Sequence, residues 1–293
     1  MKEQNLKKRI HLHIERIYST SLNETEILEF SDNIYNLIVS KKTLHTSSLL
    51  SDQWSEKTTV LITYANSITS TNNMSPLSSL QKFVSSKCQQ FIDTVHILPF
   101  FPSSSDDGFA VKDYYNIDNE FGDWKDIINI SKSFRVMADV VINHGSSEGV
   151  WFKNFIKGEG RGHDYFLSFD NTFDITEVVR PRTSPLLNTF DTHDGTRYLW
   201  CTFSKDQVDY NFNNPKVINE FVEIILYYLK MGITIFRFDA VAFLWKRIGT
   251  SCMNLEKTHE IIRLFRTIID YLSPYTVLVT ETNTPAAENV SYF

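Results

Sequence analysis

Five short and nearly continuous apolar segments recur along the chain from Thr58 onward, separated by longer segments with apolar residues at helical spacing. Continuous apolar segments are typical of strands buried on both faces of a parallel sheet, and helical spacing is typical of the helices that cover such a sheet. The pattern therefore predicts an α/β fold. The predicted strands are Thr59–Tyr64, Thr94–Pro99, Val136–Asn143, Thr234–Phe238 and Thr276–Thr280.

The sequence also marks the ends of several helices. Asn214 followed by Pro215 offers a cap and a proline for the first turn, and Asn23 and Glu26 have the spacing of a capping box for a helix at Thr25–Ser40. Later in the chain the predicted helices are Pro76–Ile92, a segment from the cap Asp123 through Ile130, Val217–Met231, and a segment from Asn254 to Leu272.

An insertion interrupts the array between the third and fourth strands. Roughly ninety residues separate these strands, far more than one crossover helix needs. Pro181 and Pro185 break any helix there, so short strands and loops are expected. We predict a helical extension at 1–57, strands one to three at 58–144, an inserted lobe at 145–212, and strands four and five at 213–293.

Composition excludes several classes of protein. The 293 residues are 42% hydrophobic, enough for a large core, and the net charge of −6 provides no basic field for nucleic acid or an anionic membrane. No apolar segment approaches the roughly 20 residues of a membrane span, and no secretory signal is recognisable. Without such a signal we expect a cytoplasmic location. Cys88, Cys201 and Cys252 are widely spaced and form no CxxC motif, so we expect reduced structural thiols and neither disulfides nor a zinc site. We also expect no other metal site and no cofactor.

Polar side chains follow the predicted strands where functional groups of parallel sheets gather. Asp106 comes after the second strand, His144 after the third, Arg237 and Asp239 lie in the fourth, and Glu281 follows the fifth. A structural ion pair would explain Arg237 and Asp239. However, neighbouring strands lie about 4.8 Å apart, so Asp239 and Glu281 can face one pocket, and a separation of about 5 to 5.5 Å suits retaining glycosyl transfer.

Four segments, taken in order, resemble the conserved regions of the α-amylase family, glycoside hydrolase family 13. They are Asp139–His144, Gln207–Asn211, Phe236–Asp239 and Thr280–Asn283. Other segments resemble the sucrose phosphorylase branch of that family, namely Val95–Phe100, Asp106–Phe109, Arg180–Arg182 and Gly249–Cys252. The N-terminal helical extension and Phe243–Lys246 are similar to the glucosylglycerate phosphorylase members of this branch.

The resemblance implies a (β/α)8 TIM barrel, of which this chain holds about the first five βα units, with a B domain inserted after strand 3 and the N-terminal extension packed on the barrel exterior. It also implies an enzyme that transfers glucose from a small α-glucoside, of the glucosylglycerate or sucrose type, to inorganic phosphate. The implied roles are nucleophile for Asp239, acid for Glu281 and an ionising neighbour of Asp239 for Arg237. Asp106 and His144 would bind sugar hydroxyls, Gln207 would reach the same sugar ring or the leaving group, and Phe109 would stack on the ring.

Two points stay open on the sequence alone. Arg180 and Arg182 are candidates for binding phosphate or the acceptor, and a structural salt bridge explains them equally well. The resemblance also implies a third carboxylate from a late His-Asp pair. His193–Asp194 precedes the predicted nucleophile and follows no barrel strand, so we reject it, and we expect an N-terminal portion of an enzyme that is inactive in isolation. A hydrolase of the same family and a non-catalytic sugar-binding fragment are the alternatives.

Overall fold

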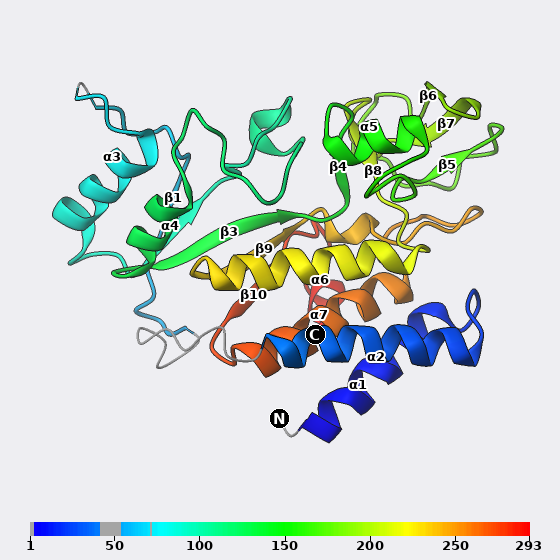
Figure 1. Cartoon of the computed structure of the whole chain (residues 1–293), viewed down its shortest axis with the longest axis horizontal. Coiled ribbons are helices and arrows are strands. Elements are labelled where there is room, and N and C mark those ends of the chain that lie inside the picture. The colour runs from blue at the N-terminus through cyan, green and yellow to red at the C-terminus, as the bar shows by residue number, and fades with distance from the viewer. Residues whose placement is uncertain (1–2, 42–53, 71) are drawn as a thin grey trace.

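A five-stranded parallel sheet forms the centre of the chain, in the order β1-β2-β3-β9-β10 (Figure 1). The computed structural model describes residues 3–41, 54–70 and 72–293. The strands are β1 (Val60–Thr63), β2 (Thr94–Ile97), β3 (Arg135–Val141), β9 (Ile233–Asp239) and β10 (Val277–Thr280). All five strands lie within two residues of the predicted positions, and the predicted α/β class is confirmed. Every residue of β2 and β3 is buried, which explains their continuous apolar character.

Helices connect and cover these strands, and most begin where the sequence predicts. Asp123 caps α4 in a capping box with Asp126, and the Asn214 side chain accepts a hydrogen bond from the Lys216 amide at the start of α6. The predicted single helix Pro76–Ile92 is wrong, because α3 ends at Phe83 and continues only as a π-helical turn. The helices are α3 (Pro76–Phe83), α4 (Trp124–Ser131), α6 (Pro215–Lys230), α7 (Glu256–Leu272) and α8 (Ala286–Val290).

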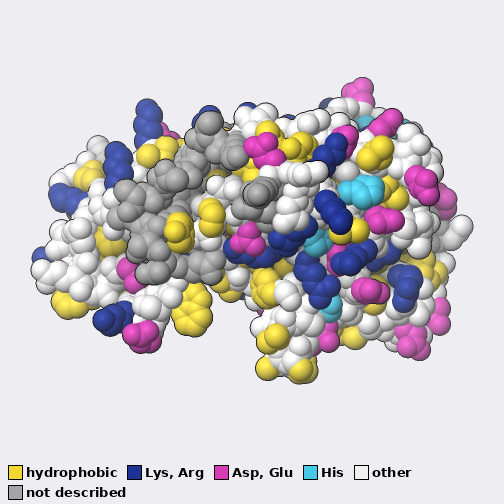
Figure 2. Space-filling view, turned by 90° about the horizontal axis from the view of Figure 1, so that it is seen from below, with side chains coloured by type: hydrophobic (Ala, Val, Ile, Leu, Met, Phe, Trp, Pro, Cys, Tyr) yellow, Lys and Arg dark blue, Asp and Glu magenta, His cyan; other side chains and the backbone are white. Residues whose placement is uncertain are grey.

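Two N-terminal helices, α1 (Glu3–Tyr18) and α2 (Glu24–Ser40), form a hairpin that packs on α7 and α6 (Figure 1). The capping box of Asn23 and Glu26 at the start of α2 is confirmed. One face of α1 is buried through apolar residues such as Ile10 and Ile14, and its outer face is charged. Figure 2 views this side, where basic and acidic side chains are interspersed. Residues 42–53 of the predicted extension lie outside the described residues.

The inserted lobe stands on a two-stranded antiparallel stalk made of β4 (His144–Ser146) and β8 (Gln207–Asp209). Beyond the stalk lie α5 (Val150–Lys157) and a three-stranded antiparallel sheet of β5 (Ser168–Phe169), β7 (Gly195–Trp200) and β6 (Leu187–Thr192). His144 therefore belongs to the stalk itself. Because the stalk rises from the carboxyl end of β3, the lobe overhangs the ends of the sheet strands (Figure 1).

Candidate active site

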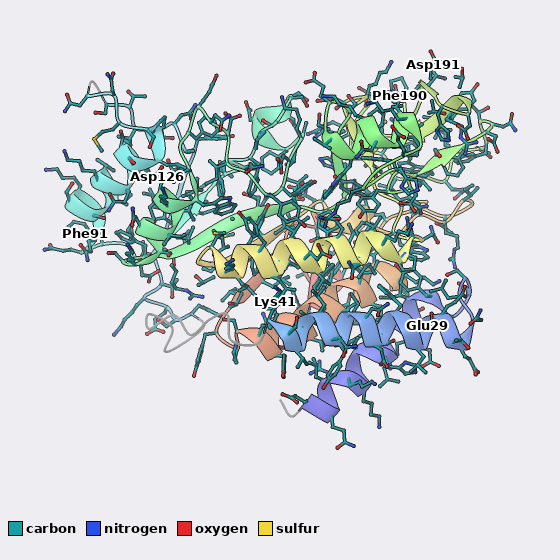
Figure 3. The ribbon with its side chains drawn as sticks, viewed as in Figure 1. Glu29, Lys41, Phe91, Asp126, Phe190 and Asp191 are labelled. Carbon is teal, nitrogen blue, oxygen red and sulfur yellow. The ribbon has the colours of Figure 1, made fainter. Side chains whose placement is uncertain are left out.

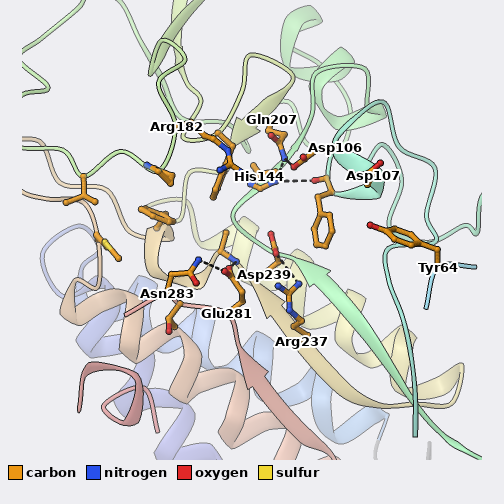
Figure 4. A pocket seen from close by; sticks show the side chains of 18 residues that line it. Tyr64, Asp106, Asp107, His144, Arg182, Gln207, Arg237, Asp239, Glu281 and Asn283 are labelled. Atoms are coloured by element: carbon orange, nitrogen blue, oxygen red, sulfur yellow. Dashed lines mark hydrogen bonds and ion pairs between the residues drawn. The ribbon is translucent and has the colours of Figure 1, made fainter. Parts of the chain in front are cut away.

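A pocket of about 500 Å³ opens at the carboxyl ends of the sheet strands (Figure 4). Its wall is built from strands β4, β8 and β9, from the loops after β1, β2, β9 and β10, and from the inserted lobe. All seven residues predicted for the catalytic and sugar-binding roles line it. They are Asp106, Phe109, His144, Gln207, Arg237, Asp239 and Glu281.

Asp239 and Glu281 reach the pocket from neighbouring parallel strands. The Glu281 amide donates to the Phe238 carbonyl at 2.9 Å, which extends the pairing of β9 and β10 to the residues beside both carboxylates. Ala240 has a left-handed φ of 53°, and its amide donates to Glu281 Oε2 at 3.0 Å. A residue with a side chain strains the backbone in this conformation, and such strain is typical of functional sites. The Asn283 side chain donates to the other Glu281 oxygen at 2.8 Å.

Asp239 is 8% exposed, and its environment favours the neutral carboxyl. Burial raises the pKa of Asp239 to about 7, Arg237 opposes this rise, and the charges of Glu281, Asp139 and Asp106 add to it. Arg237 lowers the pKa of Asp239, as the sequence led us to expect, but burial and the neighbouring carboxylates outweigh it. Arg237 Nη1 lies 2.5 Å from Asp139 Oδ1 but 3.3 Å from Asp239 Oδ1, so Asp139 takes the larger share of its charge.

A buried polar row behind the pocket explains this pairing. Asp139 on β3 is fully buried and is the register partner of Arg237 on β9, while its other oxygen lies 2.8 Å from His96 Nε2 on β2. A buried carboxylate needs such partners, since an unpaired one would be strongly destabilising. Sequence reasoning assigned no role to His96 or Asp139. The available signal was the presence of polar residues within otherwise apolar strands.

The opposite wall joins three of the predicted sugar-binding residues by direct contacts. Gln207 Nε2 donates to Asp106 Oδ2 at 2.8 Å and lies 3.1 Å from His144 Nε2. His144 Nε2 also lies 3.1 Å from the Phe109 carbonyl oxygen. Burial lowers the pKa of His144, so its imidazole is neutral near pH 7 and can donate or accept one hydrogen bond per nitrogen. The wall therefore offers a mixed set of donors and acceptors, as sugar hydroxyls require.

The structure separates the two arginines of the inserted lobe. Arg182 lines the pocket, and its guanidinium carbon lies 6.0 Å from the centroid of the Phe203 ring, which also lines it. Arg180 is not among the lining residues, and its guanidinium donates to the Ser184 carbonyl. Only Arg182 is therefore placed to meet a ligand directly.

Lys246 is a buried cation that sequence reasoning left without a role. Its Nζ lies 2.6 Å from Asp209 Oδ2 and 2.8 Å from Asn143 Oδ1, so it ties the stalk strand β8 to the end of β3. Burial lowers the pKa of Lys246, and the negative charge of Asp209 opposes that change.

Within residues 3–41, 54–70 and 72–293, no group of three or more His, Cys, Asp or Glu residues could hold a metal ion.

The rejected pair His193–Asp194 lies in the turn between β6 and β7, and neither residue lines the pocket. Asp194 accepts a hydrogen bond from the Thr192 hydroxyl and is exposed.

None of the helices in the described part of the chain is long and apolar enough to cross a membrane.

Comparison with known proteins identifies the family. Residues 90–293 match the α-amylase catalytic domain. The chain belongs to the α-amylase family. This confirms the family resemblance that was drawn from four ordered segments of the sequence.

Similar α-amylase family proteins include phosphorylases. The glucosylglycerate phosphorylase of Allomeiothermus silvanus is 45% identical over 240 residues, covering 82% of this chain and 43% of that protein. The Escherichia coli (strain K12) protein of the same name is 40% identical over 292 residues, covering 98% of this chain and 51% of that protein. The sucrose 6(F)-phosphate phosphorylase of Thermoanaerobacterium thermosaccharolyticum is 34% identical over 214 residues, covering 67% of this chain and 42% of that protein.

Solved structures support the fold. The crystal structure of sucrose 6F-phosphate phosphorylase from Thermoanaerobacter thermosaccharolyticum matches with a TM-score of 0.69 and 29% identity, covering 82% of this chain and 51% of that one. The solved structures that match this chain are TIM-barrel enzymes of the α-amylase family. The five-stranded parallel sheet corresponds to part of such a barrel, as predicted. The chain spans about half the length of the curated relatives it matches.

Proposed function

We propose that this pocket transfers the glucosyl unit of a small α-glucoside to inorganic phosphate with retention of configuration. The observation that carries the proposal is the arrival of Asp239 and Glu281 from adjacent parallel strands at one pocket. Two carboxylates on neighbouring strands suit the short separation of retaining glycosyl transfer. The similarity to proteins named glucosylglycerate phosphorylase supports phosphate as the acceptor and a glucosylglycerate-type donor.

The proposed reaction has two displacements. In the first, an Asp239 oxygen bonds to the anomeric carbon while the glycosidic bond breaks, and Glu281 gives its proton to the departing oxygen. In the second, a phosphate oxygen bonds to the anomeric carbon, and the bond to Asp239 breaks. Glu281 accepts the proton of the incoming phosphate, so both residues return to their starting states and α-glucose 1-phosphate leaves.

The remaining lining residues have proposed binding roles. Asp106, His144 and Gln207 would hold glucosyl hydroxyls, since their side chains meet on one wall. Phe109 would stack on the sugar ring. The Phe109 ring also lies near the Arg237 guanidinium, whose carbon is 5.8 Å from the centroid of that ring.

Arg182 is the proposed contact for phosphate or for the carboxylate of a glycerate group, because its guanidinium suits either oxyanion. Arg180 would support this segment through its bond to Ser184 and would not touch the ligand. We also propose a cytoplasmic location, since all three cysteines are free thiols and a reducing compartment keeps them so.

The test combines calorimetry with product analysis on the 293-residue chain. Glucosylglycerate and sucrose are each titrated into the protein, and each is then incubated with the protein in the presence and absence of inorganic phosphate. Binding with phosphate-dependent release of α-glucose 1-phosphate supports the proposal, and Asp239→Asn should abolish that release. Free glucose formed without phosphate would indicate the hydrolase. Binding without any product would overturn the activity for the 293-residue chain by itself, in agreement with the expected inactivity in isolation or with a non-catalytic sugar-binding protein. No binding would overturn all three.

A further inference from the structure

One carboxylate outside the pocket lining lies within hydrogen-bonding distance of four serine hydroxyls, two of which, Ser104 and Ser146, also lie 2.6 Å from each other. Asp206 Oδ2 lies 2.6 Å from Ser104 Oγ and 2.5 Å from Ser105 Oγ. Its other oxygen, Oδ1, lies 2.8 Å from Ser147 Oγ and 3.3 Å from Ser146 Oγ, and the Ser147 amide donates to it at 3.2 Å. An ionised carboxylate can accept about four hydrogen bonds, and few other side chains could satisfy so many donors.

The serine partners come from two segments that are far apart in the sequence. Ser104 and Ser105 lie in the loop after β2, whereas Ser146 ends β4 and Ser147 follows it. Asp206 itself directly precedes β8. The carboxylate therefore joins the loop after β2 to both strands of the stalk.

Each residue of the proposed sugar-binding wall is close in sequence to one of these groups. Asp106 directly follows Ser105, Gln207 directly follows Asp206, and His144 begins the strand that Ser146 ends. The three wall residues also contact one another in the order Asp106, Gln207, His144. Movement at Asp206 would therefore displace all three together.

The loop after β2 needs such an anchor because its backbone is strained. Asp106 and Asp107 have positive φ values of 56° and 49°, a left-handed conformation that is uncommon for a residue with a side chain. Burial raises the pKa of Asp206, but the hydrogen bonds from the serine hydroxyls lower it by more, so the pKa lies below its usual value. Asp206 is therefore charged across the neutral range, when it is the stronger acceptor.

We propose that Asp206 is a positioning residue, which fixes Asp106, His144 and Gln207 relative to one another for binding of the glucosyl ring. The proposal rests on the function proposed above. Asp206 would act through its serine partners and would not touch the substrate.

A matched control exists at the far end of the molecule. Asp126 on α4 also accepts two serine hydroxyls, from Ser75 at 3.2 Å and from Ser78 at 2.5 Å. It does not line the pocket, and Figure 3 shows it at the end of the molecule opposite the inserted lobe. Its replacement removes the same kind of interaction without affecting the wall.

The test compares Asp206→Ala with Asp126→Ala by hydrogen exchange and by titration with methyl α-D-glucopyranoside. In Asp206→Ala we expect amide exchange in Ser103–Ala110 to accelerate at least tenfold and affinity for the glucoside to fall about tenfold. Asp206→Asn keeps one acceptor oxygen and should give intermediate values. Asp126→Ala should change neither quantity, even if both alanine variants lose similar thermal stability.

Ser105→Ala removes only one hydrogen bond and serves as the gentler variant if Asp206→Ala does not fold. It should accelerate exchange in the same loop by a smaller factor. Unchanged loop exchange in a folded Asp206 variant would overturn the proposal, and so would faster exchange with unchanged glucoside affinity. If the unsubstituted chain bound no glucoside, the proposed function would fail, and the exchange measurement alone would still support or overturn the ordering of this loop by Asp206.

Discussion

Opposing forces act on the Asp239 carboxyl, and they connect stability to function. Burial and three neighbouring carboxylates favour the neutral acid, while Arg237, shared with Asp139, favours the anion. The proposed nucleophile must be ionised to attack, so the site holds a group that is unfavourable for the resting fold. Such conflicts between stability and activity are common at catalytic residues.

One consequence is a pH-dependent gain in stability for Asp239→Asn. The folded pKa of about 7 lies above the unfolded value of about 3.9, so the folded state holds this proton more tightly. The contribution of Asp239 to stability therefore declines as pH rises from about 4 to about 7. We expect Asp239→Asn to raise the free energy of unfolding by roughly 1 to 3 kcal/mol at pH 8 relative to its effect at pH 4. Urea unfolding at both pH values measures this, and equal effects would contradict the raised pKa.

The same pKa predicts the pH profile of phosphorolysis. Because the Asp239 anion attacks while Glu281 donates a proton, kcat/KM for the glucoside should have a bell-shaped pH profile, with an acidic limb that rises through about 7 as Asp239 ionises. Initial rates at low substrate concentration between pH 5 and 9 test this. A profile that is already flat at pH 5 would show that Asp239 is fully ionised in the working enzyme or does not act as the nucleophile.

At the scale of elements, the sequence predicted what depends on local signals. The strand positions followed from continuous apolar segments, and the caps Asn23, Asp123 and Asn214 followed from residue type and spacing. The pairing of Arg237 with Asp139 could not be predicted, because it depends on the register of β3 and β9. That register shifts between Val136 and Met137, and a shift of one residue changes which side chains face each other.

The contacts of Lys246 could not be predicted from the sequence for a similar reason, since they join the loop after β9 to Asn143, which follows β3, and to Asp209 on β8. Lys246→Met should lower the free energy of unfolding by roughly 3 to 5 kcal/mol, because Asp209 would remain buried without its cation. Adding Asp209→Asn should recover part of the loss. The surface pair of Lys216 and Asp164 has the same 2.6 Å separation with side chains 62% and 33% exposed, and Lys216→Met should cost less than about 1 kcal/mol. Equal losses in urea unfolding would contradict the structural role of the buried pair.

On the scale of the whole molecule, the helical hairpin α1–α2 covers one side, while both edge strands of the sheet are unpaired among the described residues. The residues of β1 alternate in exposure, and Val60 and Ile62 are the exposed ones, at 43% and 61%. Val279 on β10 is 38% exposed. Apolar edge strands favour pairing with other chains, since their backbone groups lack partners.

The 293-residue chain should therefore self-associate through the edge of β1, and Ile62→Lys should reduce that association. A lysine at an edge position resists strand pairing, because a charge would have to be brought into the new sheet. Val150→Lys is the matched control, since Val150 is 60% exposed but lies on α5 in the inserted lobe. Sedimentation velocity over a range of protein concentrations should show less association for Ile62→Lys and no change for Val150→Lys. Equal behaviour of the two variants would show that association, if present, uses another surface, because only Ile62 lies on the unpaired strand.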